Sequence, residues 1–310
     1  MKNRNSLCSA VSLLTVLSPL AVSFCSVSAF AAPHGMYLTK QLRELRGFSS
    51  STRSGVPMLY YGGPVISHAK VYTVFWGNDV ESTTQKQIGG FFSATVNSTY
   101  MDWMKLYNTV GLKAVDGRAG TEQSIGRGTY GGEIMIKPFH TGKRLDDKDI
   151  QTELDQQIDA NILPKPDADT LFMIYFPPGI SITIEGQTSC QAFCAYHEGF
   201  VSKKSGSIFY GVMPDLGGAC SFGCGSQGNR FDDLTVTSSH ELAEAITDPF
   251  PTPGDKPAYP QAWNTSKGEE IGDLCTTVST RLSTQGLTYI LQQEYDKSTL
   301  ACAPGPYQNP

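Results

Sequence analysis

The stretch TVTSSHELAEAITDPFP at residues 235–251 contains a His-Glu-x-x-Glu pattern made by His240, Glu241 and Glu244. Helices of zinc peptidases carry His-Glu-x-x-His, in which two histidines one turn apart bind zinc and the glutamate serves as the general base. Here a carboxylate replaces the second imidazole. Because helix residues four positions apart lie on one face, His240 and Glu244 can bind a metal ion together, with Glu241 as the catalytic base. The alternative is an ordinary charged helix with one histidine.

A second acidic stretch, AWNTSKGEEIGDLC, follows downstream. A catalytic zinc site needs three protein ligands, and a carboxylate from a later segment can complete the set. Glu270 and Asp273 are the two candidates for this third ligand, and they lie close to Cys275, which a disulfide could fix in place. The alternative is a turn-forming acidic loop in which neither carboxylate binds an ion.

A helix must position the first three of these residues. The Asp-Asp pair at 232–233 can cap a helix, and Pro249 ends it, which predicts a helix from about 234 to 247. Leu242 and Ile246 lie on the side of this helix away from the metal-binding pair. We therefore expect one face to be buried in a core and another face to present the pair.

Signals for strands and helices are mixed through the rest of the chain. Apolar runs predict buried strands at 71–76 and within 169–179. A regular apolar spacing predicts a helix that Asp147 or Asp149 caps. The cysteine-rich region 186–230 has little periodicity and is predicted to form loops and short hairpins. This order of elements predicts a mixed α/β (α+β) fold in a single disulfide-stabilised domain.

The cysteines indicate an oxidising compartment. Six of the eight remain after an N-terminal leader is removed: Cys190, Cys194, Cys220, Cys224, Cys275 and Cys302. An even number of cysteines in an exported chain predicts disulfides, although sequence alone leaves their connectivity open. Proximity favours bridges between the two C-x3-C pairs, CQAFC and CSFGC, and a bridge from Cys275 to Cys302. The alternative for the two C-x3-C pairs is a zinc site.

The first residues have the features of a secretory signal peptide. Lys2 and Arg4 precede an apolar run, and Ala29-Phe30-Ala31 supplies the small-x-small cleavage pattern. We therefore expect a signal peptide at 1–31 and a secreted, extracellular protein, with the periplasm as the alternative location. No later segment is apolar for long enough to span a membrane.

Removing the leader makes the chain more acidic. Its formal charge changes from −5 to −7, because Lys2 and Arg4 leave with it. An acidic chain without a basic cluster is not expected to bind nucleic acid. The remaining residues are expected to form an N-terminal arm or short helix with a linker at 32–57, one domain at 58–304 and a C-terminal tail at 305–310.

Several blocks of the sequence resemble one family. They are LYYGGPV followed by VYTVFWG, CQAFCAYH, CSFGC, HELAEAITDP and EIGDLC, which together cover roughly residues 58–303. In this order they resemble the exordium-like family, also called phosphate-induced proteins, known from plants with bacterial relatives. Two departures are Ala195, where the family often has glycine, and Asp248, where plant members often have asparagine. The resemblance implies an extracellular or wall-associated protein, and it implies no established reaction.

The resemblance adds one residue to the candidate site. His197 follows Cys194 in the matched block, and a disulfide could fix its loop near the His-Glu helix. With His197 the ligands are two histidines and one or two carboxylates, a set that suits zinc. Without His197, calcium or manganese competes with zinc. We therefore expect one divalent metal ion, with zinc favoured.

The expected function is a metal-dependent hydrolase of the peptidase type, by analogy with other helix-borne His-Glu sites. Its partner would be a peptide or a cell-envelope polymer. The alternative is a non-enzymatic extracellular or cell-envelope protein in which the same cluster is a structural metal site or a charge network. The sequence does not indicate an oligomeric state.

Overall fold

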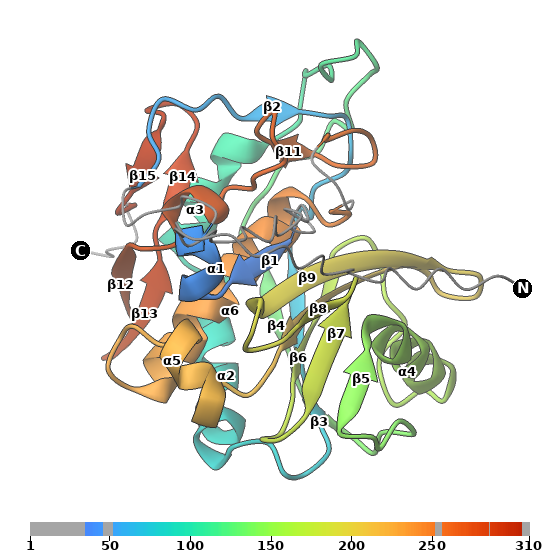
Figure 1. The fold of residues 1–310 in the computed structure, drawn as a ribbon. Coiled ribbons are helices and arrows are strands. Elements are labelled where there is room, and N and C mark those ends of the chain that lie inside the picture. Colours follow the sequence, from blue (N-terminus) through green and yellow to red (C-terminus); the bar gives the residue numbers. More distant parts are fainter. Residues whose placement is uncertain (1–34, 46–51, 252–255, 285, 306–310) are drawn as a thin grey trace, which may run out of the picture. The chain divides into compact units, whose positions relative to one another are not determined.

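A computed structural model of the chain describes residues 35–45, 52–251, 256–284 and 286–305, all of which belong to the unit Ala31–Pro310. The expected signal peptide lies outside the described residues, as does the expected C-terminal tail apart from Gly305. The fold is mixed α/β, as the sequence predicts (Figure 1). Among the described residues, no helix is both long enough and apolar enough to cross a membrane.

The main sheet has the strand order β1-β9-β10-β6-β3-β4. Its strands are β1 (Met36–Leu38), β3 (Lys70–Trp76), β4 (Thr129–Ile136), β6 (Thr170–Tyr175), β9 (Phe193–Ser202) and β10 (Gly206–Met213). β3 is parallel to β4 and β6, and β6 is parallel to β10, whereas β9 is antiparallel to both β10 and β1. Every residue of β6 is buried, because layers cover both faces of this part of the sheet. The predicted strands at 71–76 and within 169–179 are confirmed.

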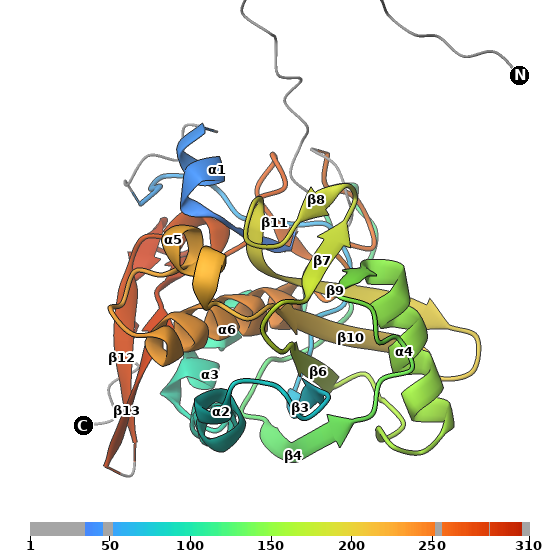
Figure 2. The same cartoon turned by 60° about the horizontal axis from the view of Figure 1, so that its bottom comes forward.

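Helices lie on both faces of the main sheet (Figure 2). The helices of the described residues are α1 (Lys40–Leu45), α2 (Ser82–Thr95), α3 (Thr99–Met104), α4 (Asp147–Asp159), α5 (Ser221–Cys224) and α6 (Arg230–Thr247), with short 3-10 turns η1 (Lys105–Tyr107), η2 (Gly218–Cys220) and η3 (Asp273–Cys275). Successive strand residues point to opposite faces. In β6, Leu171 and Met173 therefore join the core that includes α2 and α6, whereas Phe172 and Ile174 join the core that includes α4.

Smaller sheets flank the main one. β2 (Leu59–Tyr60) pairs with β11 (Trp263–Asn264), β12 (Ser279–Thr284) with β13 (Leu287–Gln292), and β14 (Glu294–Asp296) with β15 (Ala301–Ala303). In a three-stranded sheet, β7 (Ser181–Ile184) lies between β5 (Arg144–Asp146) and β8 (Gln187–Thr188). β13 packs against α6. The β12–β13 hairpin therefore covers the side of α6 that faces away from the main sheet.

The cap of α4 differs by one residue from the prediction. Asp146 is the N-cap: its side chain accepts a hydrogen bond from the backbone N–H of Lys148, and the Asp149 side chain accepts one from Asp146 N–H. This reciprocal pair is a capping box. Asp147 is buried and accepts hydrogen bonds from tyrosine hydroxyls instead. Three aspartates occur within four positions, so the sequence alone does not show which of them is the N-cap.

The expectation of loops and short hairpins at 186–230 is wrong for its central part. β9 and β10 lie in this region and form a long antiparallel hairpin inside the main sheet. Both strands are largely buried, so the alternation of apolar and polar residues that marks a half-exposed strand is missing. His197 therefore lies on a strand of the main sheet and not on a disulfide-bound loop.

The expected arm at 32–57 also contributes to the sheet. β1 pairs antiparallel with β9, and its three residues are buried, so part of the fold precedes residue 58. The short helix expected in this stretch is α1. A three-residue strand is too short to show periodicity, and its partner lies far away in the sequence, which is why the pattern of residues did not predict it.

The three disulfides have the connectivity that proximity favours. Cys190 bridges to Cys220 and Cys194 to Cys224, so the two C-x3-C pairs join each other, and Cys275 bridges to Cys302. The four cysteines of the two C-x3-C pairs form disulfides, so the alternative of a zinc site there is wrong. The first bridge joins the turn before β9 to η2, the second joins β9 to α5, and the third holds η3 against β15.

Candidate metal centre

α6 carries His240, Glu241 and Glu244. The predicted cap at Asp232–Asp233 is wrong, because the Asn229 side chain accepts the hydrogen bond from the N–H of residue 232. The two aspartates lie in the first turn instead, where negative charge favours the helix dipole. All residues from 234 to 247 are buried, so the expected exposed face is not present. Strands β1, β9 and β10 of the main sheet pack against α6, and so does β13.

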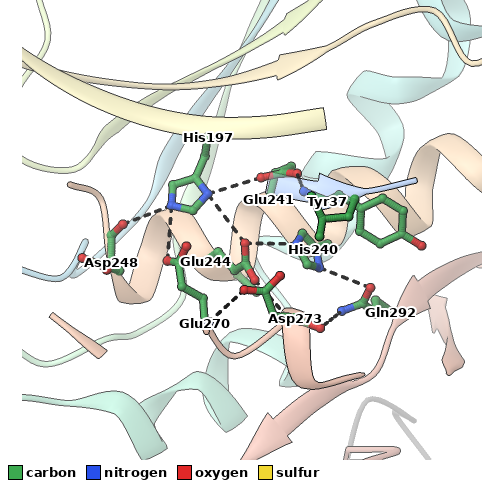
Figure 3. Close-up of polar contacts among 12 residues, drawn as sticks. Tyr37, His197, His240, Glu241, Glu244, Asp248, Glu270, Asp273 and Gln292 are labelled. Atoms are coloured by element: carbon green, nitrogen blue, oxygen red, sulfur yellow. Dashed lines mark hydrogen bonds and ion pairs between the residues drawn. The ribbon is translucent and has the colours of Figure 1, made fainter. Parts of the chain in front are cut away.

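The first pair is in direct contact. His240 Nε2 lies 3.0 Å from Glu244 Oε2, one turn along the helix (Figure 3). Both side chains are fully buried, and within the described part of the chain neither of these two atoms has a hydrogen-bond partner. Two buried polar atoms that face each other in this way need a proton or a cation between them.

Gln292 of β13 fixes which nitrogen of His240 is free. The side-chain N–H of Gln292 donates to the carbonyl of Gly272 at 2.8 Å, so its Oε1 faces Nδ1 of His240 at 3.2 Å. Nδ1 therefore carries a proton and Nε2 faces Glu244; in the neutral ring Nε2 presents its lone pair there, and in the protonated ring it donates to Glu244 Oε2. A metal-binding histidine is held in the same way, by a hydrogen bond from its other ring nitrogen.

His197 of β9 joins the cluster from the main sheet. Its Nδ1 lies 3.2 Å from Glu241 Oε2 and 3.8 Å from Glu244 Oε2. Its Nε2 lies 3.5 Å from Glu270 Oε1 and 3.1 Å from the carbonyl of Asp248. The ring thus lies between α6 on one side and the acidic stretch on the other, where the sequence resemblance suggested a ligand.

Glu270 and Asp273 approach α6 from the segment that leads into η3. The backbone N–H of Asp273 donates to Glu244 Oε1 at 3.0 Å, and the N–H of Glu270 donates to Asp273 Oδ2 at 3.0 Å. Asp273 lies on the His240 side and Glu270 on the His197 side (Figure 3). Within the described residues, neither carboxylate oxygen of Glu270 has a hydrogen-bond partner.

Two groups of side chains could hold a metal ion. One is His197, Glu241 and Glu244, and the other is His240, Glu244 and Asp273; in each group the candidate ligand atoms lie within 4.8 Å of one another. Glu244 belongs to both. Imidazole nitrogens and carboxylate oxygens are the donors that zinc takes in catalytic sites. The donor set therefore fits a divalent cation, and Glu241 is a ligand in the first group and is free to act as a base in the second.

Burial makes the carboxyl groups hard to ionise. It raises the pKa of Glu241, raises the pKa of Glu270 well above its ordinary value, and raises the pKa of Asp248 to about 7. Burial also raises the pKa of Asp273 well above its ordinary value, and the nearby Glu244 adds to this effect. Without a cation, these carboxyl groups therefore hold protons more readily than exposed carboxyl groups do.

For the two histidines, nearby charges outweigh burial in setting the pKa. Burial by itself lowers the pKa of His240, but the carboxylates of Glu244, Glu241 and Asp273 outweigh it, and the pKa is raised well above its usual range. The pKa of His197 is raised for the same reason, mainly through Glu270 and Glu241. Positive charge is thus strongly stabilised at this point. A divalent cation supplies it without protonating the ligands.

Four residues of the site were not predicted from the sequence as participants. Asp248 accepts hydrogen bonds from Ala262 and Asn264 and offers its carbonyl to His197. Gln292 orients His240. Tyr37 of β1 donates its N–H to Glu241 Oε1 at 3.2 Å. Glycine is required at 272, because a Cβ there would overlap Nδ1 of His240 and lie 2.8 Å from Glu244 Oε1.

A signal for two of these residues was present in the sequence. Asp248 directly follows α6, and Gly272 lies inside the acidic stretch EIGDLC.

Comparison with protein-family models, with curated proteins and with solved structures finds no match.

Proposed function

We propose that this chain is a secreted, exordium-like, metal-dependent hydrolase of the peptidase type, with zinc as its ion. The observation that carries the proposal is the buried contact between His240 Nε2 and Glu244 Oε2, in which neither atom has a hydrogen-bond partner in the described part of the chain. Asp273 offers a third ligand atom within reach. Three protein ligands of this kind leave room for substrate or water, as in catalytic zinc sites.

Each nearby side chain has a distinct role in this proposal. A zinc ion held there would supply Lewis-acid polarisation of a peptide carbonyl and would acidify a water molecule. Glu241 would take a proton from the attacking water, whose oxygen bonds to the carbonyl carbon, and would pass that proton to the leaving amine as the C–N bond breaks. His197, 3.2 Å from Glu241, would orient this carboxylate.

One observation favours a second candidate function. His197, His240, Glu241, Glu244 and Glu270 are all fully buried, whereas a catalytic ion must meet its substrate. In this alternative the same cluster is a structural metal site or a charge network of a non-enzymatic extracellular or cell-envelope protein. Structural zinc sites are closed in this way.

Substitution of Glu241 separates the two roles of the cluster. We expect Glu241→Gln to retain one zinc ion per chain and to lose at least about a hundredfold in peptide cleavage, the lower end of general-base effects. His240→Ala should lose both zinc and cleavage. Metal content is measured by mass spectrometry after dialysis, and cleavage with casein and a peptide library.

Two outcomes contradict parts of this assignment. Equal loss of zinc in both variants would make Glu241 a ligand, as its group with His197 and Glu244 allows. The non-enzymatic alternative would be supported if the zinc-loaded protein cleaves no peptide, and if a variant in which strand β1 is displaced from the sheet also cleaves none.

A further inference from the structure

β1 is the segment that closes the candidate metal centre. It forms the edge of the main sheet, pairs antiparallel with β9 and contacts α6. Met36, Tyr37 and Leu38 are 2%, 3% and 7% exposed. Figure 3 shows Tyr37 beside His240 and Glu241.

Tyr37 makes two contacts with the candidate site that a bound peptide could also make. Its backbone N–H donates to Glu241 Oε1 at 3.2 Å, and its ring packs edge-on against His240, with 4.8 Å between ring centroids. Glu241 is the residue to which the proposed function gives the proton. A leaving amine that had just received that proton would have its N–H where the N–H of Tyr37 lies. Tyr37 thus marks the residue on the amine side of a cleaved bond.

The rest of β1 is held by contacts that other extended peptides could also make. The N–H of His197 donates to the carbonyl of Gly35, and the N–H of Thr39 donates to the carbonyl of Ala192, both at 2.9 Å. These bonds join backbone atoms and do not depend on side chains. Without β1, β9 would be an edge strand with free backbone groups, and such an edge binds extended peptides by strand addition.

The side chains of β1 define a pattern. Tyr37 points toward the metal centre, whereas Met36 and Leu38 point to the opposite face and pack in the core that contains Tyr196 and Phe193. α1, which follows β1, has no buried residue, so β1 is held mainly by its own contacts with β9. An apolar-aromatic-apolar sequence therefore fits this edge.

We propose that β1 occupies the substrate-binding edge of the metal centre, and that the substrate class is an extended peptide with an aromatic residue flanked by apolar residues. The inference rests on the proposed function, because it takes the cluster as the place of cleavage. β1 then acts as an internal occupant, and substrate enters when β1 leaves the edge of β9.

Displacement of β1 from its far face tests this proposal without touching a metal ligand. Leu38→Lys places a charge in an apolar core, which strongly disfavours the docked strand. The matched control is Leu45→Lys on α1, where the side chain is 84% exposed. The probe is a fluorescein-labelled peptide with the sequence of Gly35–Gln41, GMYLTKQ, and its binding is followed by fluorescence polarisation.

We expect the labelled peptide to bind Leu38→Lys at least about tenfold more tightly than the parent or Leu45→Lys. A peptide with alanine in place of tyrosine should bind at least about tenfold more weakly than the probe. Zinc should leave Leu38→Lys for a colorimetric chelator at least tenfold faster than it leaves the control. Equal binding to all three proteins, or equal binding of the alanine peptide, would overturn the proposal.

A second variant tests the proposal even if Leu38→Lys does not fold. Tyr37→Ala keeps the backbone pairing and removes the ring from His240, so it should also speed zinc loss to the chelator, and an unchanged rate in Tyr37→Ala would count against the proposal. Peptide binding without any cleavage would leave the edge assignment standing and would refute the hydrolase. Cleavage that the unlabelled peptide GMYLTKQ does not inhibit would refute the edge assignment and leave the hydrolase standing.

Discussion

Two buried acidic clusters lie on opposite faces of β9, and they differ in how their polar atoms are satisfied. On the α4 side, Asp147 Oδ1 accepts hydrogen bonds from the hydroxyls of Tyr196 at 2.8 Å and Tyr210 at 2.7 Å. Its Oδ2 accepts a hydrogen bond from the Gln151 side chain at 2.6 Å. Every buried oxygen of this aspartate therefore has a donor, and the cluster is complete as it stands.

On the α6 side, several buried polar atoms have no hydrogen-bond partner among the described residues. They include His240 Nε2, Glu244 Oε2 and both carboxylate oxygens of Glu270. Proteins rarely leave such atoms unpaired, because each one costs about 1–3 kcal/mol. The comparison teaches that acidity and burial alone do not mark a metal site. The α6 cluster is a candidate because several ligand atoms converge there without other hydrogen-bond partners among the described residues.

The largest expected difference between the clusters is their response to metal. Zinc at 1,000 times its dissociation constant should stabilise the folded chain by about 4 kcal/mol, which for a domain of this size raises the melting temperature by on the order of 10 °C. Calorimetry of the chelated and the zinc-loaded protein measures this shift. Glu244→Gln should abolish it, and Asp147→Asn should leave it intact. A zinc shift that survives in Glu244→Gln would place the ion elsewhere.

The second prediction concerns the completed cluster. Asp147→Ala leaves the buried hydroxyls of Tyr196 and Tyr210 without their acceptor, so it should cost about 1–3 kcal/mol in the free energy of unfolding. Asp147→Asn keeps an oxygen for both hydroxyls and should cost less. Urea unfolding of the two variants measures the difference.

The same variants should keep a full complement of zinc, because Asp147 and the metal centre lie on opposite faces of the sheet. Loss of zinc in Asp147→Ala would show that the two clusters are coupled through β9. That result would contradict the view that the two clusters are independent of each other.

The sequence predicted the mixed α/β fold class, and it predicted which residues of α6 and of the acidic stretch lie together better than it predicted the strands around them. His240, Glu241 and Glu244 follow from local spacing on one helix, and the structure brings Glu270 and Asp273 to that helix as expected. The spacing worked because α6 is long and has an unambiguous end. Whether each of these residues binds an ion stays a prediction.

The remaining parts of the site depend on pairings between distant segments. Tyr37 reaches Glu241 across 204 positions and Gln292 reaches His240 across 52 positions. No local pattern reports such contacts. β9 was missed because it is buried on both faces and carries a histidine in its centre, so its residues read as neither an amphipathic strand nor an apolar run. The strand that positions His197 was therefore predicted as a loop.

The smallest expected effect is a pH dependence on the α4 side. Glu198 neighbours His197 in the sequence, yet it lines a cavity of about 390 Å³ together with Asp147 and Glu185. Burial, with the nearby charge of Asp147, raises the pKa of Glu198 from 4.5 to about 8. The folded state therefore keeps a proton on Glu198 at pH values where the unfolded chain has lost it. This contribution to stability is fully present below pH 4.5 and disappears as the pH rises through about 8.

Between these limits the free energy of unfolding should fall with rising pH. One group can contribute at most about 1.4 kcal/mol per pH unit, and Glu198 contributes less because the residue is only partly buried. Glu198→Gln should remove this part of the slope and should be more stable than the parent above pH 8. Urea unfolding from pH 5 to pH 9, in saturating zinc so that the metal centre stays in one state, measures both slopes. An identical slope in the variant would assign the pH dependence to the α6 side, and the two clusters would then differ in their need for a cation but not in how completely each is neutralised.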